Sequence, residues 1–316
     1  MAVKRIVCLG EALVDFVCER PVSSLGEADF FVPRQGGSLA NIAVTAARFG
    51  GEVEMLGGAG DDEWGFWLRE RIAADGVGVS DFLLVEGMST SHAFVSVSED
   101  AEPTFAFYGD AERAAERAGD RLEEALEGQP GVLVVGSDTL LGSGEREVTM
   151  RAAKLARERS WDVLCDPNLR PNRWETRAEM IGVISALVKT ASVVKLNEGE
   201  ALALTGCDEV EEAAAVLGEM GPARVVVTLG ADGALVRSGD EIESVAGREA
   251  EVVDATGAGD CVAGVIAAGL AGGLRLPGVV AAAMTAAAGV VAVWGATEGL
   301  PSAATARALL DAAVRG

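Results

Sequence analysis

Short, largely apolar runs alternate with helix-length segments along most of the chain. The runs cover residues 132–135, 161–165, 192–196 and 224–229, and each has the length of a strand. Their apolar character indicates strands that are buried on both faces, as in a parallel sheet. The pattern therefore predicts an α/β fold with a doubly wound, mainly parallel sheet that carries helices on both faces.

Two stretches depart from this alternation. Residues 82–85, 92–97 and 104–108 have the pattern of short strands joined by polar turns, with no helix between them. Together with residues 14–32 they are predicted to form a small β appendage. We expect the α/β domain to comprise residues 1–13, 33–81 and 111–316, and the appendage to comprise residues 14–32 and 82–110.

The chain is strongly acidic. Its 316 residues include 26 Lys and Arg against 49 Asp and Glu, which gives a formal net charge of −23. This balance argues against nucleic acids and anionic membranes as partners, and it means that an anionic substrate must be attracted by local donors. One uncharged segment, residues 276–296, is long enough to cross a membrane, but its alanines, glycines and valines favour a buried core helix.

The cysteine and histidine content narrows the chemistry. The five cysteines share no CxxC spacing, so we expect reduced thiols in a cytoplasmic protein, with neither a zinc site nor a disulfide framework. The single histidine, His92, excludes HExxH metal sites and any Ser-His-Asp catalysis centred elsewhere. Proton transfer is therefore expected to depend mainly on carboxylates.

Residues 253–260, with the sequence VDATGAGD, precede a segment of small apolar residues that is predicted to be a helix. The first amides of a helix lack intrahelical acceptors, and glycines allow a phosphate to approach them. The carboxylate of Asp260 lies in the same turn and would repel a phosphate that simply binds to these amides. The arrangement suits an alcohol between the two, so that the carboxylate takes the hydroxyl proton while the amides stabilise the transferring phosphoryl group. The alternative is that Asp260 only caps the helix.

Polar residues gather at the predicted carboxyl ends of the strands, where open parallel sheets bind ligands. They are Asp166, Asn168, Asn197, Glu200, Thr228 and Gly230. Asn197 and Glu200 are three positions apart at a helix start. This spacing is compatible with a capping pair and equally with a pair that positions phosphates and a Mg²⁺-bound water.

A second group of polar residues lies near the N-terminus. Gly36 and Gly37 precede a predicted helix, and their lack of side chains permits close approach of a ligand. Asn41, one turn into that helix, offers a donor and an acceptor to a hydroxylated ligand. Asp15, in an apolar setting, is either an ordinary strand-end aspartate or a carboxylate that accepts hydrogen bonds from a polyol.

Five motifs in order along the chain resemble those of the ribokinase-type, or PfkB, family of carbohydrate kinases. Gly36 and Gly37 with Asn41 are similar to the first family signature. Residues 254–260 resemble the second, DTxGAGD, with Ala255 where a hydroxyl residue is common. The other three motifs lie at residues 60–65, 195–200 and 228–233. The resemblance covers nearly all of the chain and implies a ribokinase-like α/β domain with a β-sheet lid over the sugar.

The resemblance also implies roles for individual residues. Asp260 would be the general base, and the anion hole would comprise Gly257, Ala258, Gly259 and Asp260. The sugar would contact Asp15, Gly36, Gly37, Asn41, Tyr108 and Arg170. ATP would contact Lys195, Asn197, Glu200, Thr228, Gly230, Gly233 and Ala288, and Glu200 would reach Mg²⁺ through water. A monovalent cation, K⁺, would lie beside Asp254, Thr256 and Gly295.

The expected sugar follows from the branch of the family that the chain resembles. Residues 105–108 and 166–170 look most like the fructokinase and 2-keto-3-deoxygluconate kinase branches. Many members there carry an arginine where this chain has Gly109, and an acid sugar would require a second cation beside Arg170. The absence of this second cation at position 109 favours a neutral sugar. We expect that sugar to be fructose, phosphorylated on a primary hydroxyl. The activities of a 2-keto-3-deoxygluconate kinase, a ribokinase or a nucleoside kinase stay open as alternatives.

Interpretations from other classes of protein also stay open. A dinucleotide-dependent oxidoreductase would use residues 257–259 as its GxG, but Val262 replaces the third glycine of that fingerprint. A non-catalytic sugar-binding regulator has no need of Asp260 and the glycines that this chain keeps. A Walker-type NTPase is excluded, since no lysine follows a GxxxxG stretch. The lid is also expected to provide a homodimer interface.

Overall fold

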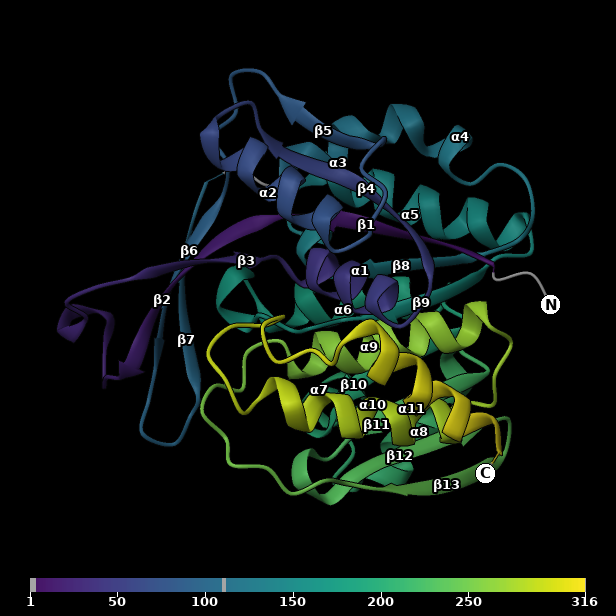
Figure 1. Cartoon of the computed structure of the whole chain (residues 1–316). Helices are drawn as coiled ribbons and strands as arrows, with labels where there is room; N and C mark the ends of the chain where they lie inside the picture. Colours follow the sequence, from purple (N-terminus) through teal and green to yellow (C-terminus); the bar gives the residue numbers. More distant parts are fainter. Residues whose placement is uncertain (1–3, 110–111, 316) are drawn as a thin grey trace.

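The larger of two β-sheets has nine strands and forms the centre of the molecule (Figure 1). The computed structural model describes residues 4–109 and 112–315. In spatial order the strands are β13 (Glu241–Ala246), β12 (Gly233–Ser238), β11 (Arg224–Thr228), β10 (Val193–Asn197), β9 (Asp162–Asp166), β8 (Val132–Gly136), β1 (Arg5–Glu11), β4 (Glu52–Gly60) and β5 (Phe82–Val85). Neighbours from β11 to β5 are parallel, and β12 and β13 add an antiparallel edge. The predicted doubly wound, mainly parallel sheet is confirmed.

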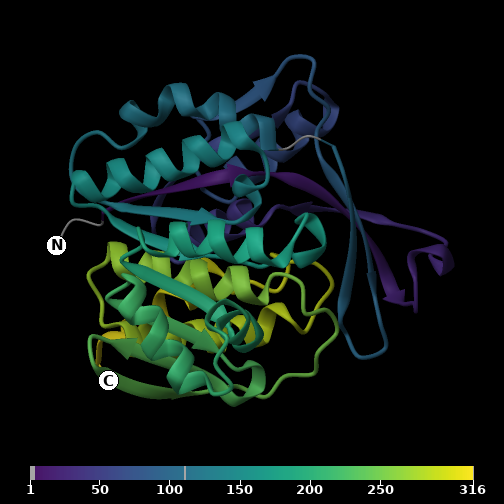
Figure 2. The same ribbon diagram turned by 180° about the vertical axis from the view of Figure 1, so that it is seen from behind.

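Helices cover both faces of this sheet (Figures 1 and 2). One face carries α1 (Ser38–Arg48), α2 (Glu63–Ala74), α9 (Ala258–Ala271), α10 (Leu276–Val290) and α11 (Ala303–Arg315). The other carries α3 (Glu112–Ala118), α4 (Leu122–Ala125), α5 (Ser143–Glu158), α6 (Arg177–Val188), α7 (Glu198–Thr205) and α8 (Val210–Met220). Short 3₁₀ turns are η1 (Leu25–Glu27), η2 (Gly119–Arg121), η3 (Asp138–Leu140), η4 (Pro171–Arg173) and η5 (Gly230–Asp232).

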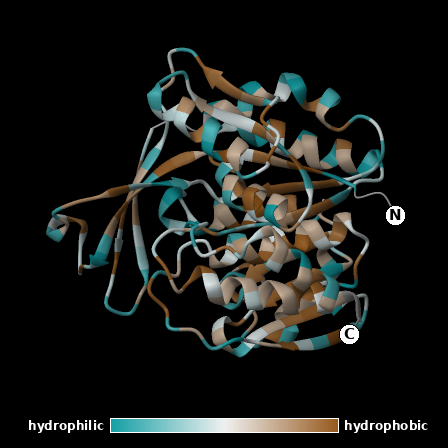
Figure 3. Cartoon of the chain, viewed as in Figure 1, coloured by the Kyte–Doolittle hydropathy of each residue, from teal (hydrophilic) through white to brown (hydrophobic). Residues whose placement is uncertain are grey.

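Burial on both faces explains the continuous apolar runs of the central strands. Successive side chains of a strand point to opposite faces. Val132 and Val134 of β8 therefore join one buried cluster, whereas Leu133 and Val135 join the other. Figure 3 shows the same pattern, with apolar residues along the central strands and polar residues towards the outside.

A separate sheet of four strands projects from one side of the α/β domain (Figure 1). Its order is β3 (Val32–Gly36), β2 (Leu13–Pro21), β6 (His92–Val97) and β7 (Pro103–Tyr108). The pair β2 and β6 is parallel, and the two outer pairs are antiparallel. A second, smaller sheet is therefore present, as predicted. The predicted boundary at residues 110 and 111 lies outside the described residues.

The strand β5 belongs to the large sheet, and its predicted place in the appendage is wrong. Phe82 to Val85 pair in parallel with Gly57 to Gly60 of β4. An edge strand such as β4 leaves a row of backbone groups unpaired, and a short apolar strand that follows α2 can pair with them. The chain enters the small sheet again only at His92.

The uncharged segment near the C-terminus forms α10, which packs against α9 and contributes Val280, Ala283 and Val290 to the core. This agrees with the predicted buried core helix. Of the helices that the structure describes, none combines the length and apolar character needed to cross a membrane.

The strands β1 and β4 approach each other closely at a pair of glycines. Gly10 and Gly57 are register partners in the parallel ladder. A Cβ atom on Gly57 would lie 1.8 Å from the carbonyl oxygen of Gly10, which is closer than any non-bonded contact allows. Glycine at position 57 is therefore required for this part of the sheet to form.

Replacement of Gly57 by alanine is expected to lower the free energy of unfolding by about 2–3 kcal/mol, because backbone atoms must move to admit the methyl group. Gly182→Ala is the matched control, since a Cβ there meets no atom within 4 Å. Because Gly182 lies in the interior of α6, the substitution by alanine should raise the free energy of unfolding by about 0.5–1 kcal/mol. Urea unfolding followed by circular dichroism measures both, and an unchanged midpoint for Gly57→Ala would contradict the close contact.

Candidate functional site

A cavity of about 720 Å³ lies between the carboxyl edge of the large sheet and the small sheet. Its lining joins segments that are far apart in the sequence. The ends of β10 and β11 provide Lys195, Asn197 and Thr228, the start of α9 provides residues 257–260, and the small sheet provides Asp15, Phe105 and Phe107. Residues predicted from strand ends and from the N-terminal glycine motif are thus brought together in one cavity.

The carboxylate of Asp260 is held by two donors from α1. Its Oδ1 accepts a hydrogen bond from the Ser38 hydroxyl at 2.7 Å, and its Oδ2 accepts one from Nδ2 of Asn41 at 2.9 Å. Asn168 in turn donates to the Ser38 hydroxyl at 2.9 Å. The carboxylate makes no capping hydrogen bond to its own helix, so the alternative of a simple helix cap does not describe Asp260.

The helix α9 begins at a glycine in the left-handed region. Gly257 has φ 78°, and a Cβ there would lie 2.6 Å from Cα of Ala296. The following residues, Ala258, Gly259 and Asp260, line the cavity. Because the first amides of a helix have no intrahelical acceptors and carry a partial positive charge, this turn is suited to binding an anion.

Asp15, on β2, is almost fully buried and requires a glycine opposite it. A Cβ on Gly36 would lie 2.3 Å from Oδ2 of Asp15. Gly37 has φ 95°, and a Cβ there would lie 2.7 Å from a carbonyl oxygen at the end of β1. Burial, together with the nearby negative charges of Asp260 and Asp254, raises the pKa of Asp15 to about 8. The side chain is therefore largely protonated at neutral pH and can donate a hydrogen bond.

A buried ion pair lies below the first turn of α9. Lys195 Nζ is 3.1 Å from Oδ2 of Asp166, and both side chains are nearly inaccessible. A Cβ on Gly259 would lie 2.8 Å from the ammonium, so the charge of Lys195 sits against the start of α9. Desolvation acts to lower the pKa of Lys195, but the carboxylates of Asp166 and Glu200 outweigh it and raise the pKa. The ammonium thus adds positive charge beside the amides.

Asn197 and Glu200 form a capping box at the start of α7. The amide of Glu200 donates to Oδ1 of Asn197 at 2.9 Å, and the amide of Asn197 donates to Oε2 of Glu200 at 2.9 Å. Oε1 of Glu200 accepts from the Leu169 amide at 2.6 Å. The hydrogen bonds of the capping alternative are therefore present. Each carboxylate oxygen of Glu200 accepts one hydrogen bond and keeps a second lone pair, and both Asn197 and Glu200 line the cavity.

A second cavity of about 350 Å³ adjoins the first. The residues that line both cavities are Glu102, Thr228, Gly230, Ala255, Ala258 and Gly259. The walls of the second are mainly apolar and include Val262, Met284, Ala287, Ala288 and Val291. Of the residues predicted to contact a nucleotide, Gly233 lines neither cavity. It has φ 108°, and a Cβ there would lie 2.0 Å from the carbonyl oxygen of Val245, so it serves the β12–β13 hairpin.

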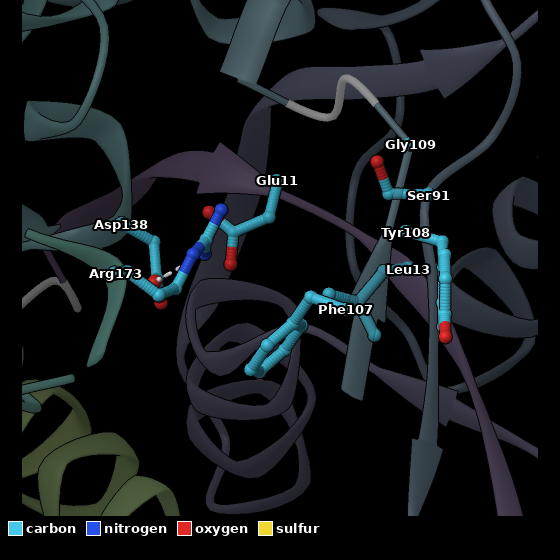
Figure 4. Close-up of a pocket in the computed structure, with 8 residues that line it drawn as sticks. All are labelled: Glu11, Leu13, Ser91, Phe107, Tyr108, Gly109, Asp138 and Arg173. Atoms are coloured by element: carbon cyan, nitrogen blue, oxygen red, sulfur yellow. Dashed lines mark hydrogen bonds and ion pairs between the residues drawn. The ribbon is translucent and has the colours of Figure 1, made fainter. Parts of the chain in front are cut away.

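The aromatic residues of β7 divide between the two faces of the small sheet. Phe105 and Phe107 line the large cavity. Tyr108 does not, because alternate residues of a strand face opposite ways. Its side chain is 55% exposed, and its ring stacks on His92 with centroids 5.6 Å apart. Figure 4 shows Phe107 and Tyr108 pointing to different sides. The structure therefore does not bring Tyr108 to the other predicted sugar residues.

Three polar residues of the site were not singled out from the sequence: Ser38, Arg173 and Asp138. Ser38 orients the Asp260 carboxylate and lies next to Gly37 of an identified motif. Asn168, already expected among the strand-end residues, donates to Ser38. Arg173, three residues after Arg170, lines the same cavity as that residue. Asp138, which pairs with Arg173, follows an apolar strand in a segment without any motif. Nothing in the local sequence distinguishes it from a surface aspartate.

Asp254 connects the loop before α9 to the segment after α10. Its carboxylate is fully buried and accepts hydrogen bonds from the amides of Thr256 at 2.9 Å and Gly295 at 3.0 Å. The three residues predicted to surround a monovalent cation are therefore close together. The hydroxyl of Thr256 is buried without a hydrogen-bond partner. Within the described ranges, no cluster of three or more His, Cys, Asp or Glu could hold a metal ion.

Comparison with known proteins gives one consistent picture. A family model described as pfkB family carbohydrate kinase matches residues 3–303. Fructokinase-1 of Zea mays is 33% identical over 262 residues, which are 83% of this chain and 81% of that protein. The aminoimidazole riboside kinase from Salmonella enterica, complexed with aminoimidazole riboside and ATP analog, has a TM-score of 0.80 at 25% identity, covering 97% of this chain and 99% of that one. Fructokinase from Vibrio cholerae O395, in fructose, ADP and calcium ion bound form, has a TM-score of 0.82 at 27% identity, covering 98% and 99%.

The raised pKa of Asp15 leads us to expect a pH-dependent stability. Below about pH 4 the side chain is protonated in the folded and the unfolded chain, whereas between about pH 4 and 8 only the folded chain keeps the proton. Each unit of rising pH then lowers the free energy of unfolding by up to about 1.4 kcal/mol. Asp15→Asn should flatten this fall, as measured by urea unfolding at a series of pH values.

The matched control for Asp15→Asn is Asp240→Asn, because the side chain of Asp240 is fully exposed. It should leave the pH dependence of the wild type unchanged. Equal slopes for Asp15→Asn and the wild type would show that Asp15 is ionised in the folded protein, contrary to this expectation.

Proposed function

The chain belongs to the pfkB family of carbohydrate kinases and is an ATP-dependent sugar kinase, and from this premise we propose that it phosphorylates a primary hydroxyl of fructose. The observation that carries the proposal is the carboxylate of Asp260. It lies in the first turn of α9, lines the large cavity and is oriented by donors from another helix. The resemblance to fructokinases supports fructose as the sugar.

In the proposed reaction the sugar hydroxyl lies between Asp260 and the amides at the start of α9. Asp260 accepts the hydroxyl proton as the oxygen attacks the γ-phosphorus of ATP. The amides of residues 257–260 stabilise the charge on the transferring phosphoryl group, assisted by the buried ammonium of Lys195. Ser38 and Asn41 each occupy one lone pair of the carboxylate, so another lone pair remains for the proton.

The sugar itself is proposed to be held at the end of the cavity formed by α1 and the small sheet. Oδ1 of Asn41 is buried without a hydrogen-bond partner among the described residues, and such an acceptor suits a sugar hydroxyl. Asp15, protonated at neutral pH, offers a donor, and Gly37 in the cavity lining allows the ring to approach the backbone. Gly36 supports the site by leaving room for the Asp15 carboxyl group. Arg170 contributes a further donor from the opposite wall.

The adjoining apolar cavity is proposed to take the adenine of ATP. Ala288 and its neighbours would contact the base, while Thr228 and Gly230, which line both cavities, would lie along the phosphates. Mg²⁺ would neutralise charge on the phosphates. The lone pairs left on Glu200, beside Asn197, fit a water-mediated contact to that ion, since magnesium keeps several waters when it is bound with a nucleotide.

A monovalent cation, K⁺, is proposed for the segment behind the anion site. The unpartnered hydroxyl of Thr256 and the buried carboxylate of Asp254 are oxygen donors of the kind that such an ion uses, and Gly295 lies beside them.

A cytoplasmic location is also part of the proposal. It is supported by the cysteines, all of which are free thiols.

The outer face of the small sheet is proposed to be a homodimer interface. Phe16, Phe94 and His92 pack on one another there, and Tyr108 and Trp64 extend the aromatic patch to the solvent. Tyr108 is 55% exposed and Trp64 is 38% exposed. Aromatic residues are typical of interface centres, and a two-fold axis would bury the same patch on both copies.

The proposed function is tested by an assay of ADP release with fructose, 2-keto-3-deoxygluconate, ribose and nucleosides as acceptors. The highest kcat/KM with fructose would support the proposal. A preference for a nucleoside would favour the second candidate, a riboside kinase, which the similarity to the Salmonella enterica enzyme supports. Turnover of none of these acceptors would contradict the proposed reaction.

Asp260→Asn is expected to lower kcat by about 10²–10⁴-fold, because the amide cannot accept the hydroxyl proton. The affinities for sugar and ATP should change little, since Asn keeps the shape of the side chain. Steady-state kinetics and calorimetric binding measure the two effects. Asp240→Asn, on the exposed β12–β13 turn, is the control and should match the wild type. Near-normal kcat in Asp260→Asn would exclude Asp260 as the base.

Tyr108→Arg is expected to convert the dimer into a monomer, because the patch would then place two guanidinium groups opposite each other across the two-fold axis. Light scattering coupled to size-exclusion chromatography measures the mass of each variant. Arg237→Lys, on β12 at the far end of the large sheet and remote from this patch, is the control. A wild type that elutes as a monomer would contradict the interface.

A further inference from the structure

Two arginines reach the sugar end of the cavity from one 3₁₀ turn. The amide of Arg173 donates to the carbonyl of Arg170 at 2.9 Å, and in such a turn the side chains of residues three apart lie on the same side. Each guanidinium lies over one of two stacked rings. Arg170 lies 5.7 Å from the ring centre of Phe105, and Arg173 lies 5.0 Å from that of Phe107. A second cation is therefore present beside Arg170, and the expectation that Arg170 has no such companion is wrong, because Arg173 reaches the same cavity from the same turn of the chain.

The charges of these two arginines are compensated differently. Arg173 forms an ion pair with Oδ1 of Asp138 at 3.0 Å, and its side chain lies between Asp138 and Glu11 in Figure 4. Arg170 has no ion pair with any residue that the structure describes. Its contacts are the Leu169 carbonyl at 3.4 Å and the ring of Phe105. One guanidinium is thus neutralised within the cavity wall, and the other is left for the ligand.

This arrangement bears directly on the kind of sugar that fits. Hydroxyls of a neutral sugar can donate to the carboxylates of Glu11 and Asp138, which line the cavity, and can accept from the arginines. The carboxylate of an acid sugar would instead compete with Asp138 for Arg173 and would add a like charge next to it. Selectivity of this kind depends on repulsion of the wrong ligand as much as on attraction of the right one.

We propose that Asp138 is a specificity-determining residue, which neutralises Arg173 and so restricts the cavity to uncharged sugars. The proposal rests on the sugar kinase function proposed above. Asp138 begins η3 directly after β8, and its side chain is 13% exposed at the cavity wall. Arg173 then acts as a hydrogen-bond donor to a neutral sugar, and Arg170 is the arginine of this turn left to attract an anion.

Asp138→Asn tests this assignment, because the amide oxygen can still accept from Arg173 while the negative charge is lost. The kcat/KM for 2-keto-3-deoxygluconate relative to that for fructose is expected to rise about tenfold or more, since one negative charge that competes with a substrate carboxylate for Arg173 is removed. Calorimetric titration of 2-keto-3-deoxygluconate without ATP should give a matching gain in affinity. An equal loss with both sugars, or an unchanged ratio, would overturn the proposal.

Arg173→Gln provides a second variant, for which the opposite change in the ratio of acid-sugar to neutral-sugar kcat/KM is expected. It leaves the negative charge of Asp138 without its partner, so the ratio of acid to neutral sugar should fall, and it should cancel the gain of Asp138→Asn in the double variant. A rise in the ratio would overturn the proposal. A wild type that prefers the acid sugar would also overturn it while the kinase function stands, whereas a wild type inactive on every sugar would refute the proposed function itself. Even if the enzyme is inactive on every sugar, the calorimetric titration still measures how loss of the Asp138 charge changes the affinity for 2-keto-3-deoxygluconate.

Discussion

The close contact between α1 and the first turns of α9 is the constraint on which the site depends. Gly264, one turn beyond Asp260, has no room for a side chain, because a Cβ there would lie 2.7 Å from the carbonyl oxygen of Ile42. This approach brings Ser38 and Asn41 within hydrogen-bond distance of the Asp260 carboxylate. A larger residue at the crossing would separate the proposed base from the two donors that orient it.

The proposed site must attract an anionic nucleotide although the protein as a whole is strongly negative. A net charge of −23 offers no long-range attraction to a nucleotide, so the attraction must come from groups at short range. The amides at the start of α9 and the ammonium of Lys195, which lies against Gly259, are such groups. Because Lys195 and Asp166 are buried, water screens the ammonium poorly, and its effect on a bound phosphate is strengthened.

The strands and helices were predictable wherever their burial requires a recognisable pattern of apolar residues. Strands covered on both faces are apolar at nearly every position, and this pattern was sufficient to predict the parallel strands β8 to β11 and a sheet with helices on both faces. The same argument failed for β5, because a four-residue apolar strand has the same pattern whether it pairs with β4 or joins the small sheet. For Tyr108, which was expected in the sugar site from the family resemblance, alternation predicts that it and Phe107 face opposite ways but not which of them faces the cavity.

The sequence by itself determined the anion site and its carboxylate, because residues 257–260 are contiguous and a helix start brings amides and side chain into one turn whatever surrounds it. Only the tertiary structure decided which groups complete the site. Ser38 reaches Asp260 across 222 positions of sequence, and Asp138 meets Arg173 across 35. Such contacts depend on how helices and strands pack together, which a local pattern does not encode.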